Sequence, residues 1–452
     1  MRTFRSWVQR RRGWQRRVAL PAIRARRIAS ILPGLLFAAE LALFASRLQV
    51  PTRYMFDEVY HAYTAGQYVA GNRDAYVWYT QAPPGVAYMW NHPPLGLHLI
   101  SLGIRLWGDD SYGWRFASAL FGAIGVVLAY FLALSLTRRT GVAALAAAFL
   151  LTDGLYFVQA RIAMLDIFGV VFMMGAFLCF HRFWTAPAER VRGPLLGTGL
   201  CLGLAMATKW NAAYASALVG LAVVGRMLWA WRAERRTGAE RRVLGRSLPW
   251  VGVGLVAIPP LVYLLAYVPF FMTGHDLGAF VELQKQIFYY HARLQSTHPS
   301  QSSWWQWPLA WRPVWYYMTT TGPRVANIYA NGNPILYWAL VPAVLWLTWR
   351  WGKNHDPGLA TILLGFFGQW LPWALVPRIA FAYHFLPAVP FGCVALAVML
   401  ARAFGLGTLG RALAVAYGIT VVAAFAFFFP IYAALPLMPE SLALRMWFPT
   451  WR

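Results

Sequence analysis

The amino-acid sequence predicts an all-α protein that crosses a membrane many times, with about 11 transmembrane helices. Of its 452 residues, 59% are hydrophobic and only 12% are charged, whereas charged residues make up about 25% of an average soluble chain. Long stretches such as 167–180 and 412–430 contain no charged residue. A helix needs about 20 such residues to cross the hydrocarbon core of a bilayer. About ten apolar stretches follow one another, more than one soluble core could bury.

The apolar stretches divide the chain into an odd number of spans. We expect transmembrane helices at residues 28–47, 113–137, 142–158, 164–184, 194–209, 211–231, 249–272, 334–350, 358–376, 383–401 and 411–432. The N terminus is then cytoplasmic and the C terminus lies outside. One further apolar run, 95–107, is too short to cross and is predicted to be an interfacial helix in the first outer loop.

The distribution of arginines decides between this topology and one more crossing. Ten arginines fall within the first 27 residues and six within 232–246, and both clusters adjoin apolar spans. Such clusters are typical of cytoplasmic flanks, which also attract anionic lipids. A crossing at 95–107 would place the two clusters on opposite sides of the membrane. The net charge of +25 is therefore a sign of membrane topology, and we expect no nucleic-acid partner.

The predicted topology divides the chain into three parts. A basic cytoplasmic segment, 1–27, precedes a transmembrane catalytic domain, 28–432, and an outer C-terminal tail, 433–452. Two long outer loops interrupt the transmembrane domain, at 48–112 and 273–333. The second loop is dense in tryptophan and tyrosine, which is typical of an interfacial aromatic belt and equally of a substrate groove.

Polar residues gather where the spans reach the outer side. Asp57 and Glu58 follow the first span, with His61 close behind. Two carboxylates beside a histidine favour a general-base or metal site, although acidic residues also favour ordinary helix starts. His92 precedes a Pro-Pro pair that forces an extended turn before a helix.

Basic and acidic residues recur at the outer ends of the next spans, namely Arg115, Arg161 and Asp166. A buried Arg–Asp pair could be purely structural. Arginine also binds phosphate through two parallel hydrogen bonds. These residues together suggest a site for a negatively charged phospholipid donor.

These motifs resemble the protein O-mannosyltransferases, polytopic members of the C-type glycosyltransferase superfamily. The resemblance rests on Asp57-Glu58, on His92-Pro93-Pro94-Leu95-Gly96, on Arg115 and on the Arg161 to Asp166 element. Further segments like those of bacterial members occur at 207–210, 307–309, 312–317 and 383–387. The resemblance spans about residues 50 to 400, and Leu97 stands where the family has a lysine.

The resemblance implies a C-type glycosyltransferase architecture and an inverting transfer of mannose from polyprenyl-phosphate-mannose to Ser or Thr hydroxyls of translocated proteins. Asp57 is then the expected base and Glu58 an orienting residue, with the two roles exchangeable. The expected donor-phosphate residues are His92, Arg115, Arg161, Lys209 and Arg378. Supporting roles fall to His61, Asp166 and His384, with Asp166 holding Arg161. The expected acceptor groove contains Trp307, Arg312 and Tyr316.

No cofactor is expected, although a divalent ion between Asp57 and Asp166 is compatible with the residues. The expected partners are the lipid-linked donor, membrane lipids and secreted or membrane proteins, with the secretion machinery as a further candidate. The expected location is the cell membrane, with the active site outside. A glycolipid acceptor, a secondary transporter and a non-catalytic membrane subunit are the alternative functions. Paired repeats and broken helices at mid-membrane would indicate a transporter.

Overall fold

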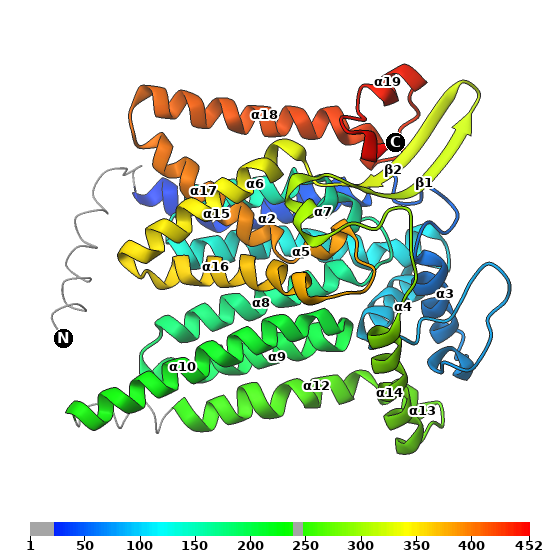
Figure 1. The fold of residues 1–452 in the computed structure, drawn as a ribbon, viewed down its shortest axis with the longest axis horizontal. Coiled ribbons are helices and arrows are strands. Elements are labelled where there is room, and N and C mark those ends of the chain that lie inside the picture. The colour runs from blue at the N-terminus through cyan, green and yellow to red at the C-terminus, as the bar shows by residue number, and fades with distance from the viewer. Residues whose placement is uncertain (1–21, 238–246) are drawn as a thin grey trace.

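The computed structural model describes residues 22–237 and 247–452 and shows a bundle of long helices whose axes run roughly side by side (Figure 1). The bundle is formed by α2 (Ala22–Ala45), α5 (Ser111–Thr137), α6 (Thr140–Leu151), α7 (Gly154–Gln159), α8 (Asp166–Thr185), α9 (Arg192–Thr208), α10 (Ala213–Thr237), α12 (Ile258–Ala266), α15 (Pro334–Asn354), α16 (Pro357–Trp370), α17 (Val389–Phe404) and α18 (Thr408–Tyr432). The basic N-terminal cluster up to residue 21 and most of the 232–246 cluster lie outside the described residues.

Each predicted span contains helix, but not every helix could cross a bilayer by itself. Within the described ranges, six helices are both long enough and apolar enough: Ser111–Thr137, Asp166–Thr185, Trp210–Arg232, Ser247–Ala266, Pro357–Leu375 and Thr408–Tyr432. The remaining spans contain shorter apolar helices or helices broken into two pieces. The predicted number of 11 crossings therefore stays a prediction.

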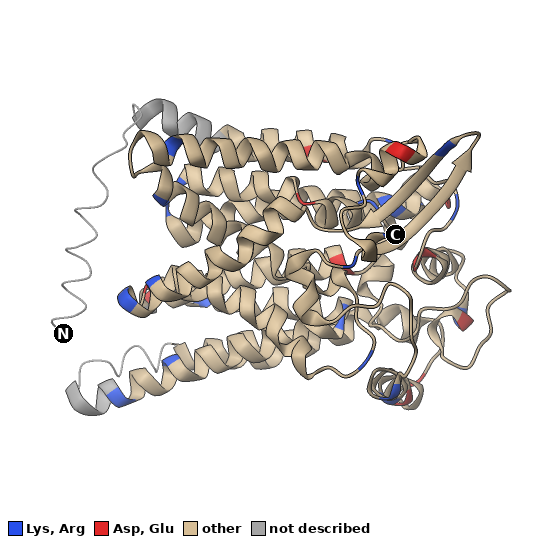
Figure 2. Ribbon diagram, turned by 45° about the horizontal axis from the view of Figure 1, so that its top comes forward, with Lys and Arg blue, Asp and Glu red and all other residues tan. Residues whose placement is uncertain are grey.

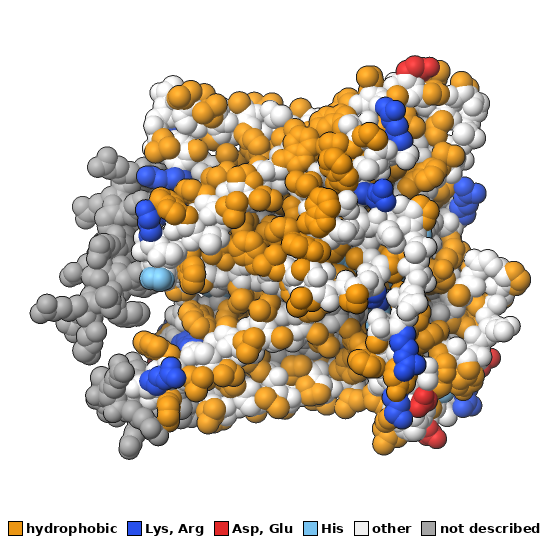
Figure 3. Space-filling model, viewed as in Figure 1, with side chains coloured by type: hydrophobic (Ala, Val, Ile, Leu, Met, Phe, Trp, Pro, Cys, Tyr) orange, Lys and Arg blue, Asp and Glu red, His pale blue; other side chains and the backbone are white. Residues whose placement is uncertain are grey.

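Charged residues avoid the middle of the bundle. Figure 2 shows Lys, Arg, Asp and Glu mainly towards the two ends of the long helices, and Figure 3 shows apolar side chains over the surface between them. In the most apolar 18-residue stretch of α8, 72% is buried inside the protein, so this helix is central. The corresponding stretches of the Ser247–Ala266 helix and of α18 are only 6% and 17% buried. The apolar surface of these helices, which lie at the periphery of the bundle, suits contact with lipid.

Glycines let neighbouring helices approach closely. A Cβ atom added at Gly199 of α9 would lie 1.5 Å from the carbonyl oxygen of Gly254, and one added at Gly103 would lie 2.4 Å from that of Gly113. No side chain fits at either contact. Small residues at such positions are typical of packing between membrane helices.

The two loops that are predicted to lie outside gather at one end of the bundle, together with the end of the 249–272 span and the C-terminal tail (Figure 1). The two loops contain α3 (Glu58–Val69), α4 (Leu95–Trp107) and α14 (Leu277–Arg293), while α13 (Val268–Met272) ends the 249–272 span and α19 (Pro439–Ala443) belongs to the tail. α4 covers the 95–107 run and lies beside α3 at this end. The connections α15–α16 and α17–α18 lie at the opposite end.

A β-hairpin departs from the predicted all-α fold. β1 (Val314–Thr321) and β2 (Arg324–Ala330) form a two-stranded antiparallel sheet within the loop 273–333. β-branched and aromatic residues dominate this segment, and Gly322 takes a φ of 57° at the turn. Such composition favours strands, and glycine at the first turn position favours a hairpin. The aromatic residues at 315–317 therefore belong to a strand.

The C-terminal tail packs onto this end of the molecule. Trp451 is 2% exposed, and its indole Nε1–H donates a hydrogen bond of 2.9 Å to the carbonyl oxygen of Ala310. Leu437 forms a bridge with Val325 of β2. The tail thus supports the hairpin.

Candidate active site

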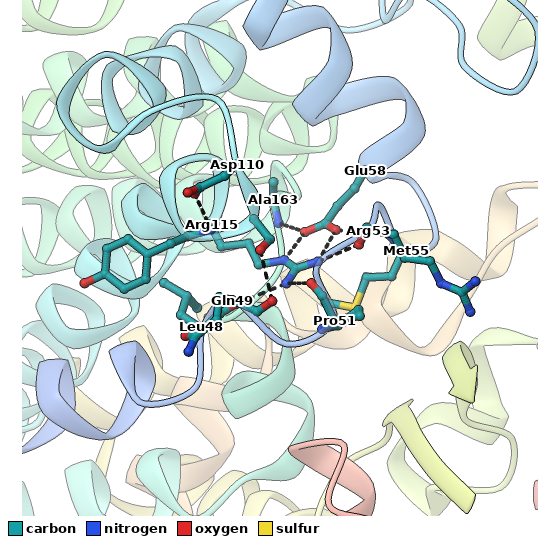
Figure 4. A network of polar contacts seen from close by, with 11 residues as sticks. Leu48, Gln49, Pro51, Arg53, Met55, Glu58, Asp110, Arg115 and Ala163 are labelled. Carbon is teal, nitrogen blue, oxygen red and sulfur yellow. Dashed lines mark hydrogen bonds and ion pairs between the residues drawn. The ribbon is translucent and has the colours of Figure 1, made fainter. Parts of the chain in front are cut away.

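The two adjacent carboxylates have different surroundings. Glu58, the first residue of α3, is fully buried and accepts hydrogen bonds from Arg115 Nε at 2.7 Å and Arg115 Nη2 at 2.6 Å. Its oxygens also accept from the backbone N–H groups of Met55 and Ala163, each at 3.0 Å. Figure 4 shows this network. The Glu58 carboxylate is therefore fully engaged in holding the loop that precedes α3.

Arg115 is equally occupied. Besides its two bonds to Glu58, its Nη1 donates to the carbonyl oxygens of Leu48 at 3.0 Å and Pro51 at 2.7 Å. Its Nη2 also donates to the carbonyl oxygen of Arg53 at 3.1 Å. A guanidinium has five N–H donors, and these contacts use all of them. The geometry does not support the prediction that Arg115 binds the donor phosphate, because no donor is left for it.

Asp57, in contrast, offers a free carboxylate. It occupies the N-cap position of α3 but caps no backbone N–H, and within the described chain no hydrogen bond is formed to its side chain. Burial raises the pKa of Asp57 to about 7, with Lys209 opposing and Asp166 reinforcing the rise. A carboxylate with a pKa near neutrality is suited to accept a proton during a reaction.

Lys209 and Asp166 form the second ion pair of the site. Lys209 follows the last residue of α9, and its Nζ lies 2.9 and 3.0 Å from the two carboxylate oxygens of Asp166, at the start of α8. The same ammonium lies 5.4 Å from the ring centre of Tyr383. Lys209 therefore presents a positive charge close to Asp57.

The prediction that Asp166 holds Arg161 is wrong. Arg161 Nη1 instead donates to the carbonyl oxygens of Phe44 and Ser46, both at 2.6 Å. These carbonyls belong to the end of α2 and the turn after it, where helical partners are lacking. A cation is also favourable at the negative end of a helix. Arg161 thus caps α2, and the phosphate role predicted for it finds no support in its contacts.

A cluster of histidines and an arginine lies near Lys209. Arg378 Nη1 donates to Nδ1 of His291, and Nε2 of His291 donates to the carbonyl oxygen of Asn91 at 2.8 Å. The ring centres of His92 and His291 are 5.1 Å apart. Burial, together with nearby Arg378, lowers the pKa of His291 to about 4. The histidines are therefore neutral hydrogen-bonding groups, and Arg378 carries the charge.

His61 and His92 have unused ring nitrogens. Nδ1 of each is buried without a hydrogen-bond partner among the described residues. Burial and the nearby Lys209 lower the pKa of His61 to about 3 and that of His92 well below its usual value. Within the described ranges, no three side chains of His, Cys, Asp or Glu form a cluster that could hold a metal ion. A reaction without a metal stays a prediction.

Aromatic side chains enclose the approach to Asp57. Phe56, with a φ of 50°, stacks on Tyr316 with ring centres 4.4 Å apart, and Tyr383 meets its edge at 6.3 Å. The Tyr316 hydroxyl accepts a 2.8 Å hydrogen bond from Gln159. Of the predicted acceptor-groove residues, Tyr316 therefore lies in the site.

The other two predicted groove residues have other contacts. Trp307 is 2% exposed, donates to Ser302 at 3.1 Å and lies 6.1 Å from the ring of His384. Arg312 donates to the carbonyl oxygens of Pro299 and Gln301, at 3.3 and 3.4 Å. Both side chains bind residues 299–302 and so stabilise that loop. The sequence patterns did not single out Phe56, Gln159 or His291, because each acts through partners distant in the chain.

Comparison with known proteins agrees with this geometry. Residues 34–275 match the family described as dolichyl-phosphate-mannose-protein mannosyltransferase, and residues 276–451 match the C-terminal four-transmembrane region of protein O-mannosyltransferases. The chain belongs to the protein O-mannosyltransferase family. It is accordingly a multi-pass membrane enzyme, and the predicted family is confirmed.

Relatives of this mannosyltransferase occur in bacteria and yeast. The chain is 30% identical to the polyprenol-phosphate-mannose–protein mannosyltransferase of Mycobacterium tuberculosis, covering 80% of this chain and 81% of the relative. It is 28% identical to the enzyme of the same name from Corynebacterium glutamicum, over 80% of this chain and 81% of that protein.

Solved structures support the predicted fold class. The S. cerevisiae Pmt1–Pmt2 complex bound to its sugar donor matches with a TM-score of 0.79 at 16% identity, over 94% of this chain and 92% of that chain. ArnT from Cupriavidus metallidurans, bound to undecaprenyl phosphate, matches with a TM-score of 0.57 at 17% identity, over 91% and 76%. At such identities the likeness concerns the fold, and the predicted helical glycosyltransferase architecture is confirmed.

Proposed function

We propose that this mannosyltransferase moves mannose from a polyprenyl-phosphate-mannose donor to Ser or Thr hydroxyls of proteins, with Asp57 as the base. The observation that carries the proposal is the contrast between the two neighbouring carboxylates. The Glu58 carboxylate accepts four hydrogen bonds inside the protein, whereas the Asp57 carboxylate accepts none from the described residues. Family membership supports the donor and the protein acceptor.

Proton transfer explains why a free carboxylate is needed. An acceptor hydroxyl is a poor nucleophile at neutral pH, so its proton must leave as the new bond forms. In the proposed step the hydroxyl oxygen attacks C1 of mannose, Asp57 takes the proton, and the bond between C1 and the phosphate oxygen breaks. A single displacement of this kind inverts the configuration at C1.

The leaving phosphate is proposed to bind the cationic side of the site. It departs as an anion, which needs fixed positive partners more than it needs an acid. Lys209 and Arg378 supply the charge, while neutral His92 and His291 contribute hydrogen bonds. Lys209 is the closer candidate to the reacting centre, because its charge also acts on Asp57.

The basic connections support an outward-facing site in the cell membrane. Lys353 lies in the last turn of α15 and Arg411 in the first turn of α18, at the end of the bundle opposite α3 and the hairpin (Figure 1). By the positive-inside rule, basic residues at that end support a cytoplasmic position for it and an outer position for the site. Acceptors would reach it during or after translocation, which makes the secretion machinery a candidate partner.

A transfer assay tests this function. Purified enzyme receives radiolabelled polyprenyl-phosphomannose with either a Ser/Thr-containing peptide or a glycolipid acceptor. We expect label in the peptide, and label appearing only in the lipid would overturn the proposal. Asp57→Asn is expected to abolish transfer while donor binding persists. Asp74→Asn, at an exposed position in the same outer loop, is the matched control and should retain activity.

A further inference from the structure

The hairpin register shows which backbone groups of β1 face away from β2. Thr321 pairs with Arg324 across the two-residue turn, and Thr320 pairs with Val325. In an antiparallel ladder, residues that bond to the partner strand alternate with residues whose N–H and C=O point outwards. A two-residue turn is closed by a hydrogen-bonded pair, here Thr321 and Arg324. The backbone N–H and C=O groups of Thr320 and Met318 therefore point away from β2.

Two contacts agree with this alternation. Val325, opposite Thr320, exchanges both backbone hydrogen bonds with Leu437 of the tail, at 2.8 and 2.9 Å. The carbonyl oxygen of Met318 accepts a hydrogen bond from Arg53 Nη2 at 3.3 Å. The outward groups of both strands are thus identified by contacts outside the hairpin.

The two edges of the hairpin are consequently unequal. The tail pairs with the β2 edge at Val325, whereas the backbone-to-backbone hydrogen bonds of the described residues join β1 only to β2. Trp315 and Met318 of β1 are 47% and 46% exposed. β1 itself contains no charged residue and no proline, the features that usually protect an edge strand from further pairing.

The open edge leads to the catalytic loop. The pairing shifts between Trp315 and Tyr317, so Tyr316 is the extra residue of a β-bulge. Bulges near active sites redirect a side chain, and here Tyr316 stacks on Phe56, directly before Asp57. Arg53, also in this loop, lies 5.2 Å from the ring centre of Tyr317.

We propose that the outer edge of β1 binds the acceptor polypeptide as an added, extended strand that runs towards Asp57. The proposal rests on the proposed function, because it requires a protein acceptor. Backbone hydrogen bonds supply affinity without regard to sequence, and alternate side chains face the enzyme. Such binding would present a Ser or Thr hydroxyl to the base while accepting many surrounding sequences. Arg53, which is exposed, would move away from the Met318 carbonyl.

Proline at an outward position tests the edge directly. Thr320→Pro removes an N–H that the ladder with β2 does not use, and proline is tolerated at such edge positions. Thr320→Ala keeps this N–H and is the matched control. Losing one backbone hydrogen bond corresponds to about a fivefold weaker interaction. We expect Thr320→Pro to raise the KM for a peptide acceptor about fivefold or more, with the KM for the donor unchanged. Equal peptide KM values for the two variants would overturn the proposal.

A second experiment uses the unaltered enzyme, so it does not depend on folding of a variant. Peptide acceptors carry a single N-methyl group at successive positions beside the acceptor Ser. Strand addition predicts alternation, in which methylation raises KM at every second position. A flat or non-alternating pattern would overturn the edge proposal. Absence of label in every peptide, including the unmethylated one, would instead show failure of the proposed function and of the edge proposal with it.

Discussion

Replacing Glu58 by glutamine separates a structural carboxylate from a catalytic one. The change removes the negative charge opposite Arg115, whose side chain and that of Glu58 are both 0% exposed. It also places an NH₂ group among donors, because both Glu58 oxygens accept hydrogen bonds. Breaking a buried ion pair from one side costs about 3–5 kcal/mol. We expect Glu58→Gln to lower the free energy of unfolding by about this amount, since no water can replace the lost partner.

Unfolding in mixed micelles, followed by tryptophan fluorescence, measures this loss. Asp57→Asn is the matched control, because its carboxylate has no partner among the described residues, and it should unfold like the wild type while losing transfer. A Glu58→Gln enzyme with wild-type stability but no transfer would refute the reasoning and give Glu58 a chemical role.

Three further predictions concern the reaction itself. Because burial raises the pKa of Asp57 to about 7 and the base must be ionised, kcat should fall as the pH drops below about 7; a profile flat down to pH 5 would contradict this. Arg378→Gln should raise the KM for the donor about tenfold or more, since hydrogen bonds to charged groups contribute about 1.5–3 kcal/mol, whereas Arg312→Gln should leave it unchanged in the same initial-rate assay. Phe56→Ala should lower kcat and move the acidic limb of the pH–rate profile to lower pH, because water would reach Asp57; an unshifted limb would show that Phe56 does not shield the carboxylate.

The sequence by itself determined the membrane character, the positions of the helices and the family. These properties depend on local composition and on ordered motifs, which can be recognised without knowing which residues meet. Hydropathy located helix within each predicted span, and the motifs from Asp57 to His384 indicated a glycosyltransferase. Asp57 was also identified as the preferred base from the sequence alone, and that role stays a prediction for the assays above.

Only the tertiary structure decided how the charged residues share their roles. Arg115 and Arg161 resemble phosphate ligands in sequence, yet the first is saturated by Glu58 and loop carbonyls and the second caps α2. Lys209 takes Asp166 as its partner, 43 residues away. The hairpin, its bulge and its open edge were equally invisible in the hydropathy pattern. The physical reason is that a buried charge binds the groups that packing brings to it, and sequence distance does not determine those neighbours.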